Sequence, residues 1–226
     1  MLRSVIFDFD GVITDSEVLH LRSFNRVLGR FNVEISSKDY YQTYLGLSDF
    51  DCYRALIKNG VLRISERQIP GLVEQKNRIF EELARTEGRT IEGVHKFLKM
   101  LYQNKVPMSI CSGALGSEIE MLLEEADLRY FFSVIVSAEQ VKKGKPDPEG
   151  FLLTLQRLNK GRMEPIEANQ CIVIEDSHWG LAAASAAGMH TIAVTNTYEA
   201  EYLGRAEKIV SRLDTLSIAD LQQLCT

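Results

Sequence analysis

Residues Asp8 to Ser16, with the sequence DFDGVITDS, follow the apolar run Val5–Phe7 and decide how this chain folds. A short continuous apolar run of this kind is typical of a buried strand. Asp8 and Asp10 would share one face of an extended strand, and Gly11 lets the backbone leave the sheet directly afterwards. Ligands bind beyond the carboxyl ends of strands in open parallel sheets, and close carboxylates repel without a cation or a shared proton. The stretch indicates metal-assisted chemistry on an anion, although an Asp-rich turn without chemistry also fits these residues alone.

The composition of the chain points to a folded protein that acts on a small molecule. Its 226 residues are 45% hydrophobic, which is enough for a full core and a small second domain. A formal net charge of -5 and a pI near 5.5 leave no basic patch for nucleic acid and no basic amphipathic stretch for a membrane. The first strand begins at once, and no apolar run reaches membrane-spanning length. We therefore expect a cytoplasmic protein, a monomer or weak homodimer, that binds a small metabolite.

The cysteines and histidines are dispersed and give no sign of a disulfide framework or a zinc site. The 4 cysteines have no CxxC spacing, and the 4 histidines lack zinc-site spacing. Cys111 and Cys171 lie in strand-like runs, where a small hydrophobic residue is expected. We therefore predict reduced cysteines and no zinc chemistry.

The segment after the first strand has a helical pattern. From residue 16 to residue 85, apolar residues recur at spacings of three and four, and no convincing strand is present. Polar breaks at 29–37, 46–49 and 59–60 predict about four short helices, which end in the polar stretch 85–89. This segment is predicted to be an all-helical insertion.

From residue 90 onward, short apolar strands alternate with helices. Strands are predicted at 108–111, 134–136, 171–174, 191–194 and, more weakly, 209–210, with helices at 93–103, 117–126, 148–158 and 180–187. Continuous apolar strands separated by helices predict a parallel sheet that is covered on both faces. The N-terminal strand must belong to this sheet.

The predicted fold is therefore an α/β protein with a doubly wound parallel sheet and an inserted all-helical cap. Its core comprises residues 1–15 and 89–226, and its cap comprises residues 16–88. Hinges are expected where the chain crosses between them, with a cleft above the strand ends.

A serine turn and a lysine loop follow two further strands. Ser112 and Gly113 bring a hydroxyl and approachable amides to the sheet edge, which suits an oxyanion or a phosphate. An ordinary strand-to-helix turn with a Ser cap is the simpler explanation of this motif alone. Lys145, flanked by Gly144 and Pro146, is placed to act as a fixed point charge on phosphate. The two lysines before it in KKGKPDP are expected to be solvated.

A second acidic pair ends another strand. Glu175 and Asp176 follow an entirely apolar run, so their oxygens would meet those of Asp8 and Asp10 at one edge. Magnesium favours sparse carboxylates, retained waters and the phosphate of a substrate. The alternative, acids that favour a helix N-terminus, does not explain why both strands end in acids. We therefore predict a Mg²⁺ site.

The motifs DFDGVITDS, CSGA, KKGKPDPEGF and IEDSHWGLAAASAAGM, in this order and spacing, resemble the haloacid dehalogenase-like superfamily. The resemblance is closest to the branch with phosphoglycolate phosphatases and beta-phosphoglucomutase, which carries a helical cap between the first two motifs. It covers essentially the whole chain. The family's chemistry is then expected of this protein.

The resemblance assigns roles to the acids. Asp8 would be the nucleophile that forms an aspartyl-phosphate, and Asp10 would be the general acid and base. Asp176 would bind magnesium with the Asp8 carboxylate and the Asp10 carbonyl, while Glu175 would ligate the ion or support it from outside. Carbon–halogen cleavage needs no acid to protonate an alkoxide, so Asp10 favours phosphate esters.

The resemblance also assigns the residues that hold the transferring phosphoryl group. Its oxygens would be bound by Lys145, by Ser112 and by the backbone amides near Gly113. A loose phosphoryl transition state needs in-line positioning and neutralised oxygens.

The cap decides between phosphatase and phosphomutase. His20 matches the mutase pattern, but many phosphatases of the branch share it. Where mutases carry G-V-S-R, whose arginine grips a distal phosphate, this chain has G-L-S-D, Gly46 to Asp49 with Ser48 between them. An acid at that position would repel a second phosphate, so we predict a phosphatase acting on a sugar phosphate or similar monoester, with a beta-phosphoglucomutase-type enzyme as the alternative. His20, Gly46, Ser48 and Lys76 are candidate substrate contacts in the cap, and for His20 and Lys76 plain surface or packing roles are the alternative.

A phospho-acceptor signalling module is the remaining alternative. Such a module would also have an open α/β sheet with acids and a lysine. The helical insertion and Asp10, which should speed hydrolysis of an acyl phosphate, argue against it.

Overall fold

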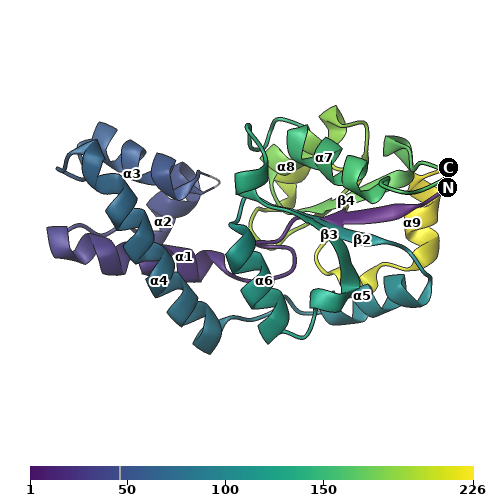
Figure 1. The fold of residues 1–226 in the computed structure, drawn as a ribbon, viewed down its shortest axis with the longest axis horizontal. Helices are drawn as coiled ribbons and strands as arrows, with labels where there is room; N and C mark the ends of the chain where they lie inside the picture. Colours follow the sequence, from purple (N-terminus) through teal and green to yellow (C-terminus); the bar gives the residue numbers. More distant parts are fainter. Residues whose placement is uncertain (46) are drawn as a thin grey trace. The chain divides into compact units, whose positions relative to one another are not determined.

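The structure is a computed structural model that describes residues 1–45 and 47–226. The chain forms two compact units: Met1–Asp15 with Arg89–Thr226, and Ser16–Gly88 (Figure 1). Gly46, a predicted substrate contact, lies outside the described residues. Within those residues, no helix combines the length and the apolar character that a membrane crossing requires.

The first unit is built on a parallel sheet of six strands, in the order β3-β2-β1-β4-β5-β6. Their bounds are β1 Ser4–Phe7, β2 Met108–Cys111, β3 Phe132–Val136, β4 Cys171–Glu175, β5 His190–Val194 and β6 Lys208–Val210. All the predicted strands are present. Every residue of β1, β2 and β4 is buried, which explains their continuous apolar character.

Helices cover both faces of this sheet, so the predicted α/β fold is confirmed. Figure 1 shows α7 and α8 on one side of the sheet and α5 and α6 on the other. The bounds are α5 Val94–Gln103, α6 Gly116–Glu125, α7 Glu149–Leu158, α8 His178–Ala186 and α9 Ile218–Leu224. Short 3₁₀ turns at Arg129–Phe131, Ala138–Gln140, Ala168–Gln170, Ala200–Leu203 and Leu213–Thr215 complete the connections. Phe7 of β1 packs edge-on against Phe97 of α5, with ring centroids 6.1 Å apart.

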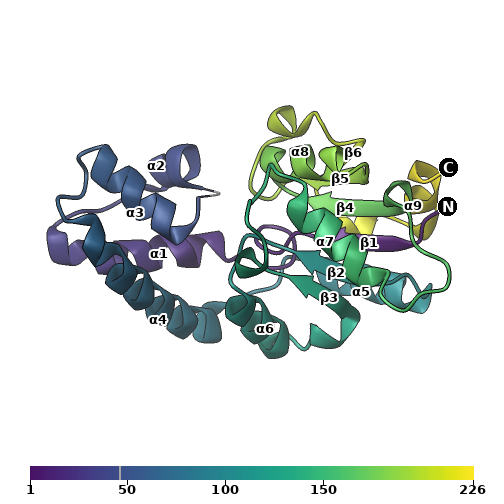
Figure 2. The ribbon, with the colours of Figure 1, turned by 45° about the horizontal axis from the view of Figure 1, so that its top comes forward.

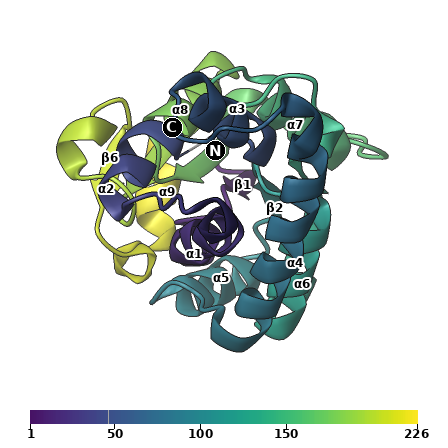
Figure 3. The same ribbon diagram turned by 90° about the vertical axis from the view of Figure 1, so that its left-hand side faces the viewer.

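The second unit is helical, and no strand occurs among its described residues. It comprises α1 Glu17–Leu28, α2 Ser37–Asp39, a π-helical turn Tyr40–Tyr44, α3 Asp49–Lys58 and α4 Ile69–Glu87, with 3₁₀ turns at Gly29–Phe31 and Glu66–Gln68. Figure 2 and Figure 3 show α1, α3 and α4 from two directions. Its own core includes Phe24, Tyr53, Leu56 and Leu72.

Two predicted helix boundaries in this unit agree with the structure to within a residue. Of the break predicted at 46–49, Leu47 and Ser48 are non-helical, and α3 begins at Asp49 because the Ser48 hydroxyl accepts a hydrogen bond from the Asp51 amide. The predicted end of the helices in the polar stretch 85–89 is confirmed, because α4 ends at Glu87. Arg22 of α1 binds both carboxylate oxygens of Glu87, which adds a contact that local sequence does not display.

Candidate active site

The predicted acids meet where β1 and β4 end side by side. Phe7 is in register with Ile174, and the Asp8 amide donates to the Ile174 carbonyl at 2.9 Å. From β1 the chain passes to β2 on one side, and β4 lies on the other, so the strand order reverses at this point. Ligands of open α/β sheets bind at such a switch point.

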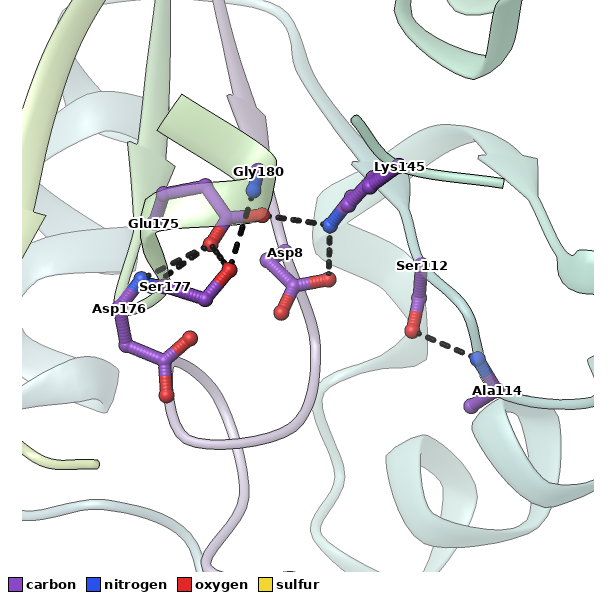
Figure 4. A network of polar contacts seen from close by, with 8 residues as sticks. All are labelled: Asp8, Ser112, Ala114, Lys145, Glu175, Asp176, Ser177 and Gly180. Carbon is purple, nitrogen blue, oxygen red and sulfur yellow. Dashed lines mark hydrogen bonds and ion pairs between the residues drawn. The ribbon is translucent and has the colours of Figure 1, made fainter. Parts of the chain in front are cut away.

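Three carboxylates form a compact cluster at this edge. One oxygen from each of Asp8, Glu175 and Asp176 lies within 4.8 Å of the others, and all three residues are buried (Figure 4). The pKa of Asp8 is raised to about 7, mainly by burial; the charges of Glu175 and Asp10 also raise it, and Lys145 lowers it. The cluster therefore holds more negative charge than the protein around it easily accommodates.

Lys145 joins the two neighbouring strand ends. Its Nζ donates to Asp8 Oδ1 at 2.6 Å and to Glu175 Oε1 at 2.5 Å, and lies 5.3 Å from the centre of the Phe151 ring. Burial lowers the pKa of Lys145, but the Asp8 and Glu175 carboxylates outweigh burial and raise it above its ordinary value. The side chain is thus a fixed positive charge at the strand ends.

Glu175 has both carboxylate oxygens engaged. Oε1 accepts from Lys145, and Oε2 accepts from the Asp176 amide at 3.0 Å, the Ser177 amide at 3.0 Å and the Ser177 hydroxyl at 2.8 Å. Sequence reasoning left Glu175 either as a metal ligand or as a support outside the ligands. These contacts give it a defined structural task, which is to hold Lys145 and the turn that carries Asp176.

Gly180 leaves room for Glu175, a role that the sequence pattern did not reveal. A Cβ added at Gly180 would lie 1.7 Å from Glu175 Oε1, so the site excludes any side chain there. The Ser177 hydroxyl also caps α8 by accepting from the Gly180 amide at 3.1 Å. The small residues at the start of α8 had been explained by packing against the sheet, and only the folded chain brings Gly180 against this carboxylate.

Gly11 gives the loop after β1 a conformation that only glycine adopts easily, with φ of +73°. A Cβ at this position would lie 1.8 Å from Asp176 Oδ2. The Asn196 side chain donates to the Gly11 carbonyl at 2.8 Å and ties this loop to the segment after β5. Asn196 had not been recognised from the sequence, because no motif marks it.

We expect Gly11→Ala to impair metal binding more than its backbone strain alone explains. Gly188 is a matched control, because its φ is +75° but the nearest atom to an added Cβ is 3.7 Å away. Both variants should lose about 1–2 kcal/mol of stability from left-handed backbone strain. Only Gly11→Ala should weaken magnesium binding, by at least roughly tenfold, since Asp176 must move. Calorimetric titration of magnesium measures this, and equal affinities in the two variants would contradict the contact.

The remaining core residues lie at neighbouring strand ends. Ser112 follows β2 and is buried, and its hydroxyl accepts from the Ala114 amide at 3.0 Å. Gly113 is exposed, with open space where a side chain would stand. Asp10 is half-buried in the loop after β1, where it forms a β-bridge with Thr14. Figure 4 shows Ser112 on the opposite side of Asp8 from Glu175.

The residues of the acid cluster fit a hard divalent cation. Asp8, Glu175 and Asp176 offer only oxygen, and Lys145 is a single positive charge beside three carboxylates. Oxygen donors with excess negative charge suit Mg²⁺ better than a thiolate- or imidazole-preferring metal. The cluster can thus hold a metal ion.

Two of the predicted cap residues, His20 and Lys76, lie together within the helical unit. Lys76 is only 1% exposed, and its Nζ lies 2.8 Å from His20 Nδ1 and 2.9 Å from Asp49 Oδ2. His20 stacks on Phe80 with ring centroids 4.0 Å apart. Burial and the charge of Lys76 hold the pKa of His20 well below its ordinary value. Lys76 is therefore a buried, paired cation, and Ser48 is the cap of α3.

An open parallel sheet, an acid cluster bridged by lysine at its strand ends and an inserted helical unit define the structural class. The model of the haloacid dehalogenase-like hydrolases matches residues 5–194, and the chain belongs to this family. The resemblance identified from the four motifs is confirmed, and the protein is an enzyme, a phosphoric monoester hydrolase of the haloacid dehalogenase-like type.

Two curated relatives and one solved structure illustrate these similarities. The chain is 36% identical to the chloroplastic 5-amino-6-(5-phospho-D-ribitylamino)uracil phosphatase of Arabidopsis thaliana over 70% of its length, and spans 40% of that protein. It is 30% identical to the phosphorylated carbohydrates phosphatase of Thermotoga maritima over 84% of each chain. Beta-phosphoglucomutase of Clostridium difficile shares the fold, with a TM-score of 0.85, 24% identity and coverage of 100% and 97% of the two chains.

Proposed function

We propose that this protein is a magnesium-dependent phosphatase that hydrolyses a sugar phosphate, or a similar small polyol phosphate, through an aspartyl-phosphate on Asp8. The observation that carries the proposal is the Lys145 ammonium between Asp8 and Glu175, with Asp176 beside them at the strand ends. This arrangement supplies a carboxylate nucleophile and a fixed cation for phosphate oxygens. In this proposal residues 1–15 and 89–226 are the catalytic core and 16–88 are the cap that selects the substrate.

The first half-reaction is phosphoryl transfer to Asp8. An Asp8 carboxylate oxygen attacks phosphorus, and the bond from phosphorus to the substrate oxygen breaks. Asp10 donates its proton to that leaving oxygen, so the sugar departs as a neutral alcohol. Lys145, the Ser112 hydroxyl and the amide of Gly113 hold the phosphoryl oxygens and orient them for in-line transfer.

The second half-reaction restores the enzyme. Asp10, now a carboxylate, removes a proton from water as the water oxygen attacks phosphorus. The bond between phosphorus and the Asp8 oxygen breaks, which releases inorganic phosphate and regenerates the Asp8 carboxylate. Proton and phosphoryl group both balance over the two steps.

Asp8 and Asp176, together with the Asp10 carbonyl, would hold Mg²⁺, and Glu175 would support them through the turn 175–177. When bound, the ion neutralises charge on the phosphate oxygens and favours the ionised form of Asp8. This matters because the pKa of Asp8 is raised to about 7, mainly by burial, even with Lys145 beside it.

A monophosphate substrate is supported by the ion pair of Lys76 in the helical unit. Asp49 Oδ2 lies 2.9 Å from the Lys76 Nζ, so this ammonium already has a carboxylate counterion. A cation neutralised in this way attracts a second phosphate less than an unpaired one would. His20, Ser48, Lys76 and Gly46 remain proposed determinants of substrate choice. The names of both curated relatives, one for a phosphorylated ribitylamine and one for phosphorylated carbohydrates, support a polyol phosphate.

A panel of phosphorylated sugars and sugar alcohols tests this function. We expect release of inorganic phosphate with magnesium, at kcat/KM of about 10⁴ M⁻¹s⁻¹ or more for the best substrate. Excess EDTA should abolish the release, and added magnesium should restore it. Conversion of beta-glucose 1-phosphate to glucose 6-phosphate without phosphate release would establish the mutase alternative instead. A stable phosphoprotein without turnover would establish a signalling module.

A further inference from the structure

The loop that carries Lys145 is closed by a carboxylate from the helix that follows it. Glu149, in the first turn of α7, accepts hydrogen bonds from two consecutive amides, that of Lys142 at 2.9 Å on Oε1 and that of Lys143 at 3.1 Å on Oε2. These contacts join the beginning of the loop to its end. The side chains of Lys142 and Lys143 are exposed, and their contacts with Glu149 are made by the backbone amides.

Further hydrogen bonds stiffen the loop between these two points. The Asp147 amide donates to the Gly144 carbonyl at 3.0 Å, and the Glu149 amide donates to Asp147 Oδ1 at 3.0 Å. Lys145 lies between these contacts, in the middle of the closed loop. The Glu149 carboxylate bridges the longest separation in this network, six to seven residues.

Lys145 needs such support because its side chain is long and its target is narrow. Its Nζ must reach Asp8 Oδ1 at 2.6 Å and Glu175 Oε1 at 2.5 Å at the same time. A lysine side chain has four rotatable bonds and no rigid plane, so the position of its backbone decides whether both contacts form. A displacement of about 1 Å in such a group can cost roughly a hundredfold in rate.

We infer that Glu149 is a positioning residue, which holds the loop 142–149 so that the Lys145 ammonium reaches Asp8 and Glu175. Its effect on catalysis rests on the proposed function, whereas its effect on Lys145 does not. Glu149 touches neither acid among the contacts of the described residues, and acts through the backbone of the lysine loop.

Chemical labelling of Lys145 tests the inference without any need for activity. In the magnesium-loaded protein Lys145 should react slowly with an N-hydroxysuccinimide ester, because its side chain is 18% exposed and paired with two carboxylates. Glu149→Ala should speed this labelling by about tenfold or more, since two hydrogen bonds to a charged group are lost. Glu149→Gln retains an acceptor oxygen and should fall between the two. Mass spectrometry locates the modified lysine.

Glu207 provides the matched control. Its carboxylate accepts from the Thr191 amide at 3.1 Å, and it pairs with His190 at the start of β5. Glu207→Ala thus removes a carboxylate-to-backbone contact of the same kind at β5, away from the loop that carries Lys145. It should leave the labelling of Lys145 and kcat unchanged. Equal labelling of Lys145 in the Glu149→Ala, Glu207→Ala and unmodified proteins would overturn the inference.

Kinetics with the best substrate of the panel provide the second readout. Glu149→Ala should lower kcat by roughly 10–100-fold, with a smaller change in KM. In a protein that already carries Lys145→Ala, Glu149→Ala should cost little more, because a positioning residue has nothing left to position. Full additivity of the two losses would reject the positioning role. If the unmodified protein releases no phosphate, the proposed function fails, while the labelling result still decides the role of Glu149.

Discussion

Replacement of Asp8 by asparagine should reduce phosphate release by at least roughly a thousandfold, because an amide oxygen cannot form the acyl phosphate. Asparagine has nearly the same shape as aspartate, and Lys145 keeps its contact with Glu175. The loss should appear in kcat, measured with saturating magnesium and the best substrate of the panel. Single-turnover mixing with substrate should also show no phosphorylated protein by mass spectrometry.

The stability of Asp8→Asn should not fall in the absence of metal. The pKa of Asp8 is raised in the folded protein, so the folded state holds its ionised form less well than the unfolded chain does. The protonated carboxyl therefore favours the folded state at low pH, and this contribution to stability is lost as the pH rises from the ordinary aspartate pKa to the raised one. Ionisation of Asp8 thus destabilises the folded protein at pH 7, and the neutral amide of asparagine avoids this loss. Thermal unfolding of the Asp8→Asn and unmodified proteins with EDTA at pH 7 measures this difference in stability.

Asp15→Asn is the control for this experiment. Asp15 belongs to the same DFDGVITDS stretch but is exposed. It should retain activity within about twofold, as expected of a surface substitution. Activity above one tenth of the original in Asp8→Asn would rule out Asp8 as the nucleophile.

Lys145→Ala should lower both activity and stability. Removing a fixed positive charge from phosphate oxygens should cost roughly 10²–10³-fold in kcat. The two carboxylates that Lys145 bridges would lose their shared counterion, and breaking a buried ion pair in this way costs about 3 kcal/mol. Urea unfolding at pH 7 with EDTA measures the second effect, and magnesium should restore part of the lost stability because it supplies positive charge to the same acids.

Lys143→Ala is the matched control for the lysine loop. Lys143 is in the same loop, but its side chain is exposed, and its contact with Asp147 Oδ2 spans 3.5 Å at the surface. Its loss should change stability by less than about 0.5 kcal/mol. If the two variants unfold at the same urea concentration, Lys145 is not the buried counterion described above.

Most of the core fold follows from the sequence pattern. Residues 171–174 of β4 form a continuous apolar run, and β2 is apolar except for Ser109, because helices cover both faces of the sheet; such runs are visible in any sequence. The helical pattern of residues 16–85 was equally plain. The end of the helical segment within 85–89 followed from the polar residues there, whereas the contact between Arg22 and Glu87 is visible only in the structure.

Much of the candidate site was also foreseeable, since it consists of residues directly after strands. Asp8 and Asp176 had to meet once β1 and β4 were neighbours, because parallel strands bring their carboxyl ends to one edge. The roles of Gly180 and Asn196 were not foreseeable. A missing side chain and a single surface amide leave no periodic signal. Gly180 matters through the side chain of Glu175 at the end of β4, and Asn196 through the Gly11 carbonyl of a distant loop.

The sequence by itself determined the order of strands and helices, the inserted helical segment and the set of polar residues at the strand ends. These features follow from hydrophobic periodicity and from turn residues, which are local properties of the chain. The tertiary structure alone decided which of those residues touch. Lys145 reaches Asp8 across 137 residues of chain and Glu175 across 30, and Lys76 is buried against Asp49 instead of lying at the surface. Such contacts depend on the packing of distant segments to within an ångström, and a pattern of apolar and polar residues specifies only the face on which a side chain lies.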